Sequence, residues 1–545
     1  MKNFAFLLIS MLFVSACTDT KETTDLLVTN AKVYTVNENF DITEAFVITD
    51  GKIVAVGTEE VLLKKYNPSK TLDAKGKTIL PGLIDAHAHL FNLGVTLQQV
   101  DLVGSASYQE VLDRVVAFQE KKNTNYIIGR GWDQNDWEVK EFPTKEELDK
   151  LFPDTPVALT RIDGHAMIVN SKALALANIS PQTQVPGGEV EVANGELTGI
   201  LIDAPMGLVR ATIPEMNQTT RVQALQDAEA ICVSLGLTTI NDAGLSQNVI
   251  EAIDSLQQKG VMDIRVYAMI SNTPKNLDYY LDKGIIKTDR LNVRSVKVYA
   301  DGALGSRGAA MKAPYSDKEN HFGAMITPQS ELQSLASRIS KAGYQMNTHA
   351  IGDSANVAVL RAYKEALKDR EDSRWKVEHA QIIDTKDFNY FSKNIIPSVQ
   401  PTHATSDMYW AEDRVGEDRI KGAYSYKTLL DQAGIIALGT DFPVEKVNPM
   451  HTFYAAVARK DLENYPEGGF RKEEGLSREE TLRGMTIWAA YSNFEENEKG
   501  SIEVGKFADF IILDKNIMEV DEDSIPNIKV LSTYINGEEV FSAIE

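Results

Sequence analysis

The sequence predicts an α/β protein built around a (β/α)8 TIM-type barrel, with a small β-sandwich formed by both termini of the chain. Three observations support this prediction. The middle of the chain alternates short β-branched apolar runs with longer helical patterns, both ends are rich in strand-like segments, and histidines end or closely follow several of the apolar runs. The 545-residue length suits one large domain with smaller additions.

Residues 1–17 have the features of an export signal. Lys2 precedes an apolar run over residues 4–14 that is too short to cross a bilayer. The run ends in Val-Ser-Ala-Cys at residues 14–17, which resembles the lipobox of bacterial lipoproteins and implies cleavage before Cys17 and lipidation of that cysteine. An ordinary secretory peptide, with Cys17 incidental, is the alternative. Both alternatives predict an exported protein, and the lipobox predicts one held in the periplasm or cell envelope by a lipid anchor.

A polar tether over residues 18–24 is expected to lead into the first part of the β-sandwich, residues 25–78. This part contains short β-branched runs and an Asp50-Gly51 turn. The second part, residues 500–545, contains similar runs and an Asn536-Gly537 turn. We therefore expect the two ends of the chain to pair beside the larger domain.

The barrel is expected to occupy residues 79–499. Eight β-branched runs are its candidate strands: Thr78–Ile84, Thr238–Asn241, Arg265–Met269, Val293–Tyr299, Gln345–Thr348, Lys376–Glu378, Ile395–Val399 and Ile435–Leu438. More than a hundred residues separate the first two of these runs. Because a structureless loop of that length is uncommon, we expect a large inserted subdomain over about residues 95–221.

The net charge of −22 argues against nucleic acid or an anionic membrane surface as a partner. The charge does not identify the substrate, which is expected to be a small molecule. The chain has two cysteines, Cys17 and Cys232. If Cys17 is lipidated or removed, no disulfide forms within the chain, and Cys232 lies in an apolar helical pattern that indicates a core position. The oligomeric state is left open, homo-oligomers included.

His87 and His89 are one residue apart in a run that reads as a strand, so both imidazoles point to the same side and can bind one cation. Further polar residues lie within, at or after later strands. Because the carboxyl ends of barrel strands converge, these residues become neighbours. The predicted metal-binding set is His87, His89, Lys297, His349, His379 and Asp441.

These elements together resemble the amidohydrolase superfamily over the chain from about Asp25 to the C-terminus. More narrowly, several segments resemble its amidohydrolase 3 branch, which includes N-substituted formamide deformylase. The segments that carry the resemblance are residues 83–89, 129–133, 163–165, 296–308, 347–349, 377–379, 439–441 and 500–509.

The resemblance supplies a role for the lysine, whose ammonium has no lone pair. It implies that carbon dioxide carbamylates Lys297 to a carboxylate-like group that bridges two divalent metal ions, most often zinc. One ion would be bound by the lysine with His87, His89 and Asp441, and the other by the lysine with His349 and His379. Family members differ in metal count, so a single-ion site remains open, and Lys297 as a buried salt-bridged lysine is the alternative.

The function that follows is hydrolysis of a C–N bond in an amide, a cyclic amide or an N-acyl or N-formyl compound. A divalent metal lowers the pKa of bound water to about 7 and polarises a carbonyl, and Asp441 would carry the proton to the leaving nitrogen. Hydrolysis of an ester or lactone at the same site is one alternative. A non-catalytic, ligand-binding lipoprotein with an inert barrel is the other.

Other residues are expected to contact substrate. Arg307 could stabilise an oxyanion or clamp a carboxylate, and His403 could polarise the substrate carbonyl, so both are catalytic candidates. Trp132, His165 and Asp301 are candidates for substrate binding. The alternatives are a surface ion pair for the arginine, an ordinary loop histidine, and subdomain core for the aromatic side chain.

Overall fold

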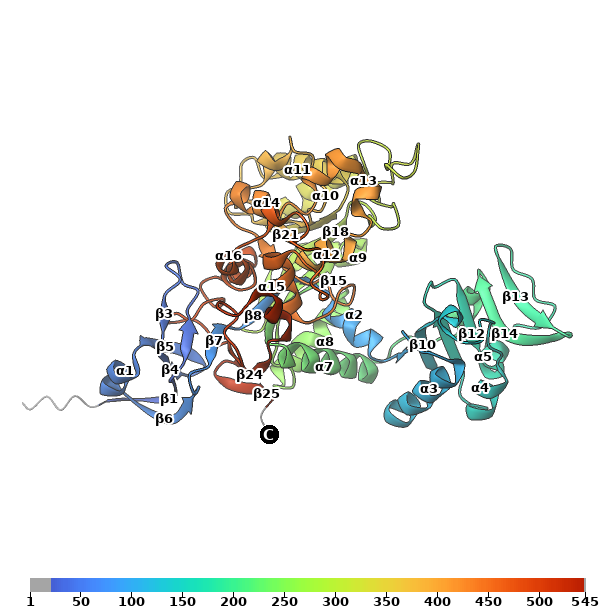
Figure 1. Cartoon of the computed structure of the whole chain (residues 1–545), viewed down its shortest axis with the longest axis horizontal. Coiled ribbons are helices and arrows are strands. Elements are labelled where there is room, and N and C mark those ends of the chain that lie inside the picture. The colour runs from blue at the N-terminus through green and yellow to red at the C-terminus, as the bar shows by residue number, and fades with distance from the viewer. Residues whose placement is uncertain (1–20, 544–545) are drawn as a thin grey trace, which may run out of the picture.

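The computed structural model describes residues 21–543, so Cys17 and the predicted signal segment lie outside the described residues. Figure 1 shows three parts along the long axis of the molecule. A central barrel carries the sheets of the two chain ends on one side. A separate lobe, formed by the segment between the first two barrel strands, lies on the other side.

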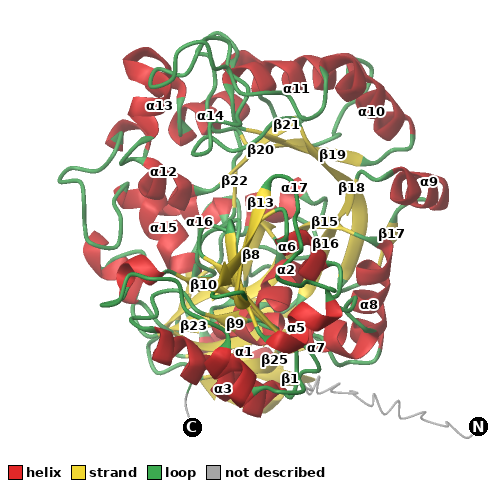
Figure 2. Cartoon of the chain, turned by 90° about the vertical axis from the view of Figure 1, so that its right-hand side faces the viewer, coloured by secondary structure: helices red, strands yellow, loops and turns green. Residues whose placement is uncertain are grey.

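The central sheet has eight parallel strands that follow one another in chain order, and Figure 2 shows them curving round in a ring. This order of eight parallel strands supports a TIM-type barrel, as the sequence predicts. The strands are β8 (Leu83–Ala88), β15 (Leu237–Leu245), β16 (Arg265–Ser271), β18 (Leu291–Tyr299), β19 (Gln345–Ala350), β20 (Trp375–His379), β21 (Ile395–Val399) and β22 (Ala437–Leu438). A short strand, β17 (Ile286–Lys287), pairs with the edge of β18.

The structure corrects the first predicted strand. The run 78–84 is divided at Gly82 into β7 (Thr78–Pro81), which pairs with the C-terminal strand β23, and the start of barrel strand β8. A side chain at position 82 would have its Cβ only 2.3 Å from the hydroxyl of Thr238. Only glycine therefore lets the chain pass from one sheet to the other at this point.

The barrel closes where the chain after β22 meets β8. The backbone N–H of Asp441 donates to the carbonyl of His87 at 2.8 Å, and the N–H of His89 donates to the carbonyl of Phe442, also at 2.8 Å. A Cβ at Gly439 would lie 2.5 Å from the backbone nitrogen of His87, so this close approach requires glycine. The first and last strand ends are thus hydrogen-bonded to each other.

Helices lie between and after the barrel strands and surround the ring in Figure 2. They are α2 (Leu90–Thr96), α7 (Gln218–Ser234), α8 (Gln247–Gln258), α9 (Pro274–Lys283), α10 (Gln329–Lys341), α11 (Asp353–Ala366), α12 (Pro401–Asp407), α13 (Ala411–Arg419), α14 (Tyr426–Ala433), α15 (Pro449–Ala458), α16 (Arg478–Gly484) and α17 (Ile487–Ser492). Ala489 and Ala490 of α17 pack against Ile84 and Ala86 of β8 and Ala437 of β22, where they fill the junction between the first and last strands.

The two ends of the chain form two further sheets, in the orders β5-β4-β1-β6 and β25-β24-β23-β7-β2-β3. Phe46 and Phe510, one from each end, meet edge to face with ring centroids 5.1 Å apart in a shared apolar core. The elements are β1 (Glu22–Thr29), β2 (Lys32–Tyr34), β3 (Ile42–Thr43), β4 (Ala45–Thr49), β5 (Lys52–Gly57), α1 (Glu59–Lys65), β6 (Tyr66–Asp73), β23 (Phe510–Leu513), β24 (Val530–Ile535) and β25 (Glu538–Ser542). β1 begins within the segment expected to be a tether.

The lobe contains a six-stranded sheet in the order β13-β14-β12-β11-β10-β9 and has apolar cores of its own. Its elements are β9 (Val100–Asp101), α3 (Tyr108–Lys122), β10 (Ile127–Trp132), α4 (Glu146–Leu151), β11 (Val157–Arg161), β12 (Ala166–Val169), α5 (Ser171–Leu176), β13 (Gly188–Ala193), β14 (Glu196–Asp203) and α6 (Met206–Arg210). A salt bridge of 2.5 Å joins Lys122 of the lobe to Asp227 of α7. Figure 1 shows the rest of the lobe extending away from the barrel.

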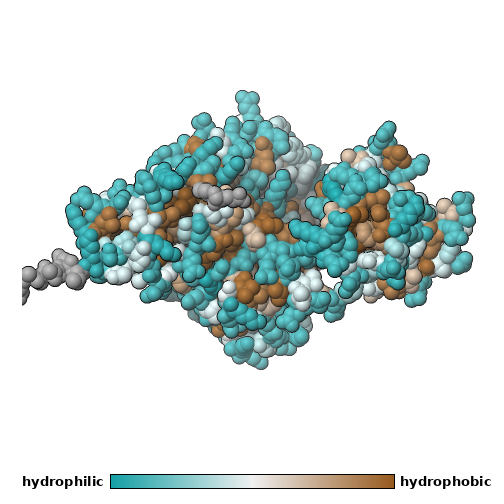
Figure 3. Space-filling model, turned by 90° about the horizontal axis from the view of Figure 1, so that it is seen from below, coloured by the Kyte–Doolittle hydropathy of each residue, from teal (hydrophilic) through white to brown (hydrophobic). Residues whose placement is uncertain are grey.

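Seen from below, the surface is mostly hydrophilic, with apolar residues in small groups on both the barrel and the lobe (Figure 3). Within residues 21–543, no helix combines the length and apolar character needed to span a membrane. Cys232 is buried in the barrel's apolar core, as expected, and burial raises the pKa of its thiol well above the usual value.

Candidate metal centre

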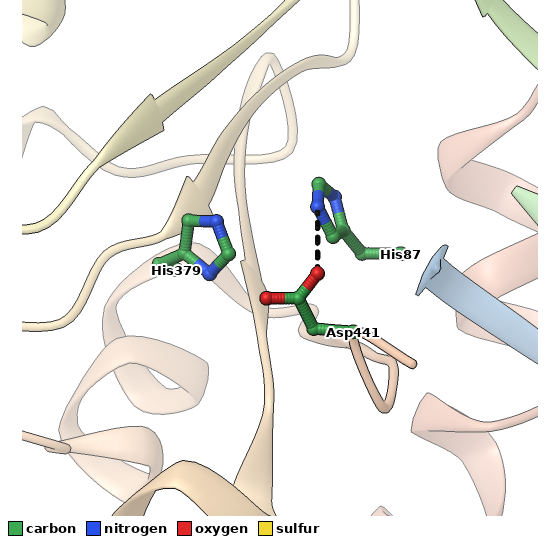
Figure 4. Close-up of side chains that lie close together, drawn as sticks. All are labelled: His87, His379 and Asp441. Carbon is green, nitrogen blue, oxygen red and sulfur yellow. Dashed lines mark ion pairs between the residues drawn. The ribbon is translucent and has the colours of Figure 1, made fainter. Parts of the chain in front are cut away.

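Three residues from distant parts of the chain meet inside the barrel at the carboxyl ends of its strands. His87 lies in β8, His379 ends β20 and Asp441 follows β22, and one ligand atom from each lies within 4.8 Å of the others (Figure 4). His379 and Asp441 have positive φ angles of 72° and 62°, a backbone conformation that non-glycine residues rarely adopt. Such strained positions cluster at functional sites.

The carboxylate of Asp441 is surrounded by imidazoles. Its Oδ1 lies 3.1 Å from Nε2 of His89 and 3.7 Å from Nε2 of His87, and its Oδ2 lies 3.7 Å from Nε2 of His403. Burial by itself would raise the pKa of Asp441, but the hydrogen bond from His89 and the nearby imidazoles hold that pKa well below its usual value. The side chain is therefore an anion, suited to binding a cation.

Two of the imidazoles are oriented by hydrogen bonds from Nδ1. In His89 this atom lies 3.0 Å from the carbonyl of Ala243, and in His379 it lies 2.7 Å from Oε1 of Gln400. Because both partners are acceptors, each Nδ1 carries a proton. Nε2 of His379 is left with its lone pair, and Nε2 of His89 faces Oδ1 of Asp441. Metal-binding histidines are commonly held in this way.

Lys297 and His349 complete the group that the sequence predicts. The Nζ atom of the buried Lys297 lies 2.9 Å from Nε2 of His87, and burial lowers the pKa of this lysine. Burial also lowers the pKa of His349 to about 3, so its imidazole is neutral. The Nε2 atom of His349 has no hydrogen-bond partner among the described residues, and its nearest carboxylate oxygen, on Asp301, is 3.6 Å away.

The residues present fit a divalent cation. Neutral imidazoles and a buried carboxylate are the donors that zinc and similar ions prefer. Nε2 of His349 and Nε2 of His403 are buried and have no hydrogen-bond partner within the described part of the chain. Such atoms are costly to leave unsatisfied, and a bound cation or its water would satisfy them.

His403 is on the first turn of α12 and not in a loop. Its ring stacks on that of His379, with centroids 5.9 Å apart and an interplanar angle of 19°. This position is compatible with the predicted contact to a substrate carbonyl, which stays a prediction.

Asp301 and Arg307 follow β18 but have other partners in the structure. The buried carboxylate of Asp301 accepts backbone N–H groups of Ala310, Ile351 and Gly352 at 2.8–3.0 Å. The guanidinium of Arg307 forms two hydrogen bonds to Asp317, at 3.0 and 2.7 Å. Asp301 thus fixes the loops beside the metal centre, and the substrate contacts expected of both residues remain predictions.

Trp132 and His165 lie in the lobe. The indole of Trp132 is fully buried in the lobe core and donates to the carbonyl of Leu159 at 2.8 Å. His165 is exposed and its Nδ1 lies 2.7 Å from Asp203. Each has its contacts within the lobe, so the structure does not bring either together with the barrel residues, and their role in substrate binding is still only predicted.

The sequence reasoning missed three residues that orient the site. Asp85 accepts hydrogen bonds at the barrel junction, Gln400 orients His379, and Nδ1 of His87 lies 2.8 Å from Oε2 of Glu378. A signal existed for Asp85 and Glu378. Asp85 lies two residues before His87, so on a strand its side chain points to the same side as His87 and His89. Glu378 directly precedes His379, a predicted ligand. Gln400 gave no such signal.

Comparison with known proteins identifies the family. The model described as "Amidohydrolase family", of the amidohydrolase 3 type, matches residues 70–541. The putative amidohydrolase YtcJ of Bacillus subtilis is 32% identical over 93% of this chain and 98% of its own length. The N-substituted formamide deformylase of Arthrobacter pascens is 27% identical over 94% of this chain and 97% of its own length.

A solved structure agrees with both fold and family. An uncharacterized metal-dependent hydrolase from Pyrococcus furiosus superposes with a TM-score of 0.76 at 29% identity, covering 91% of this chain and all of that one. The family match spans the barrel and the residues that meet inside it. The chain therefore belongs to the amidohydrolase family, in its amidohydrolase 3 branch, and is a metal-dependent hydrolase of carbon–nitrogen bonds other than peptide bonds.

Proposed function

We propose that this protein hydrolyses the C–N bond of an amide, a cyclic amide or an N-acyl or N-formyl compound. The observation that carries the proposal is the buried anionic Asp441 among the imidazoles of His87, His89 and His403. The likeness to an N-substituted formamide deformylase over nearly the whole chain supports an acyl or formyl group on nitrogen as the substrate class.

In this proposal the cation is zinc. His87, His89, Lys297 and Asp441 would hold one ion, and Lys297 with His349 and His379 would hold a second. A bound divalent ion would supply Lewis acidity and lower the pKa of water at the site. Reaction of the Lys297 amine, 2.9 Å from Nε2 of His87, with carbon dioxide would give a carbamate whose oxygens can serve as metal ligands.

The chain's own residues then bind substrate and move the proton. Asp441 accepts a proton from the attacking water and delivers it to the leaving nitrogen. The ring of His403, whose Nε2 lies 3.7 Å from Oδ2 of Asp441, donates an N–H group to the substrate carbonyl oxygen. Cys232, the cysteine within residues 21–543, takes no part because it is buried in the apolar core.

The test combines metal analysis with a substrate panel. The purified protein is analysed for bound metal by elemental mass spectrometry and by intact mass under mild conditions. It is then assayed on matched amides, N-formyl amines and esters. About two equivalents of zinc, a mass gain of one carbon dioxide and faster cleavage of amides support the proposal.

Other outcomes of the same test count against it. One equivalent of zinc together with amide cleavage would support the proposed reaction but exclude a lysine shared by two ions. Preferred cleavage of esters or lactones overturns the substrate class. Bound metal without any hydrolysis supports a ligand-binding protein instead.

We further propose that the protein is exported and anchored through Cys17, and that the paired chain ends form a β-sandwich domain beside the barrel. Labelling cells with an alkyne fatty acid tests the anchor. The native chain is expected to take up label and partition with membranes, whereas Cys17→Ser takes up none. Equal labelling of the two proteins contradicts the anchor.

A further inference from the structure

The interior of the barrel directly beneath the metal centre contains charged groups. Glu378 and His87 are both completely buried, and Oε2 of Glu378 lies 2.8 Å from Nδ1 of His87. The other ring nitrogen, Nε2, lies 2.9 Å from Lys297 Nζ and 3.7 Å from Asp441 Oδ1. The His87 ring thus has one nitrogen toward Glu378 and the other toward the metal centre.

A second buried cation accompanies Glu378 on the same strand. Lys376 precedes it by two residues in β20, so the two side chains lie on the same face of the strand. The Nζ atom of Lys376 donates to Oδ1 of Asn493 at 2.9 Å and lies 5.0 Å from the centre of the Tyr267 ring. A buried carboxylate needs compensating positive charge, and Lys376, on the same face of β20, is an electrostatic partner of Glu378.

We propose that Glu378 is a positioning residue that fixes the tautomer and orientation of His87 for metal binding, with Lys376 as its buried counter-charge. This inference rests on the proposed function, because it explains how His87, one of the proposed metal ligands, is positioned. An ionised carboxylate has no proton to donate, so it accepts only from an Nδ1–H group. The lone pair of His87 is therefore confined to Nε2, which faces Asp441.

The comparison with the other imidazoles supports a distinct role. Nδ1 of His89 is hydrogen-bonded to a backbone carbonyl and Nδ1 of His379 to an uncharged amide, whereas Nδ1 of His87 lies 2.8 Å from a carboxylate oxygen. Hydrogen bonds to charged groups are roughly twice as strong as neutral ones. The carboxylate also makes the imidazole a more basic ligand. Of these three imidazoles, His87 is the one whose Nδ1 faces a charged partner.

Three variants of the full chain test the inference. Glu378→Gln keeps an acceptor oxygen without the charge, Glu378→Met removes both, and Lys376→Met removes the counter-charge. The control is Glu474→Gln, because Glu474 is also a buried carboxylate but is hydrogen-bonded to Thr428 at the start of α14. Circular dichroism first establishes that each variant is folded.

The first readout is the zinc dissociation constant, measured by competition with a chromophoric chelator. We expect it to rise about 10- to 100-fold in Glu378→Gln and Lys376→Met, and further in Glu378→Met, as is typical for loss of such partners. Glu474→Gln is expected to bind zinc like the native chain. A folded Glu378→Met protein with native zinc affinity overturns the inference.

The second readout does not depend on metal. Long-range ¹⁵N NMR of histidine-labelled apoprotein, with His87 assigned from a His87→Gln sample, reports which ring nitrogen carries the proton. We expect the Nδ1–H form in the native chain and a mixture in Glu378→Met. An Nε2–H form in the native chain overturns the inference. If the native chain binds no metal but shows Nδ1–H, the proposed function fails and the positioning contact stands.

Discussion

Asp85 in the first barrel strand accepts a 2.6 Å hydrogen bond from the hydroxyl of Thr440, which follows the last strand. The same carboxylate accepts the backbone N–H groups of Thr440 at 3.0 Å and of His87 at 3.1 Å. Burial raises the pKa of Asp85 to about 7. One side chain thus joins the two segments that carry His87 and Asp441.

The Thr440 hydroxyl is predicted to stabilise the barrel junction. Thr440→Val has nearly the same shape but leaves a buried oxygen of Asp85 without its donor, so we expect a loss of about 1–3 kcal/mol of unfolding free energy. Urea unfolding measures this loss. Thr440→Ser, which keeps the hydroxyl, is the control and should lose less. Equal losses in both variants would contradict a role for the hydrogen bond.

Asp441 is predicted to be essential for turnover. Asp441→Asn keeps the size of the side chain but removes the basic oxygen that takes up the proton, so we expect kcat to fall at least about 10²-fold. Zinc content is measured on the same samples, which separates loss of metal from loss of proton transfer. Full activity with full metal content would exclude Asp441 as the proton carrier.

Lys376 is predicted to make stability depend on pH in the alkaline range. Burial lowers its pKa from 10.5 to about 8. Between these values the unfolded chain binds more protons than the folded one, so stability rises with pH, by up to about 3 kcal/mol. The difference in unfolding free energy between native chain and Lys376→Met should therefore change from pH 8 to 10. The exposed Lys172, changed to Met, should show no such change.

Removing the metal is predicted to abolish activity and lower stability together. A ligand that binds only the folded state at a hundred times its Kd stabilises that state by about 2.7 kcal/mol. We expect chelation to lower Tm and zinc to restore both Tm and activity. Magnesium should restore neither, because imidazole ligands favour zinc. Recovery with magnesium alone would argue for a different ion.

Gly82 is predicted to tolerate no side chain. Gly82→Ala places a methyl group 2.3 Å from the Thr238 hydroxyl, and we expect a loss of about 1–3 kcal/mol by thermal or urea unfolding. The double variant with Thr238→Ala should recover part of that loss, since the two residues are in contact. Gly207→Ala, with no atom within 4 Å of the new Cβ, is the control and should not destabilise. Additive losses in the double variant would contradict the steric explanation.

Three of the residues that local patterns select as metal ligands lie together in the structure, because they are tied to strand ends. The alternation of His87 and His89 fixes their common side, and His379 and Asp441 lie where the carboxyl ends of strands converge. The partners of these residues could not be predicted in the same way. The contact of Gln400 with His379 depends on the pairing of β20 with β21, and this pairing cannot be derived from a single sequence.

The error in the first predicted strand, and the open role of Trp132, also have physical reasons. The run 78–84 is uniformly apolar because both of its halves are buried, so nothing in its periodicity marks the passage between two sheets at Gly82. Aromatic residues such as Trp132 serve equally well in a core or in a pocket wall. The lobe core that encloses Trp132 is formed by elements whose packing the sequence pattern does not specify.

The hydrogen bond between Asp85 and Thr440 joins residues separated by 355 positions. At about 5–20 residues per second, a ribosome needs roughly 20 to 70 s to make the intervening chain. During that time β8 is already synthesised but has no last strand beside it, and its two histidines have no carboxylate to share a cation with. β8 therefore stays without its last neighbouring strand, and the metal centre stays without Asp441, until the C-terminal part of the chain is available to fold.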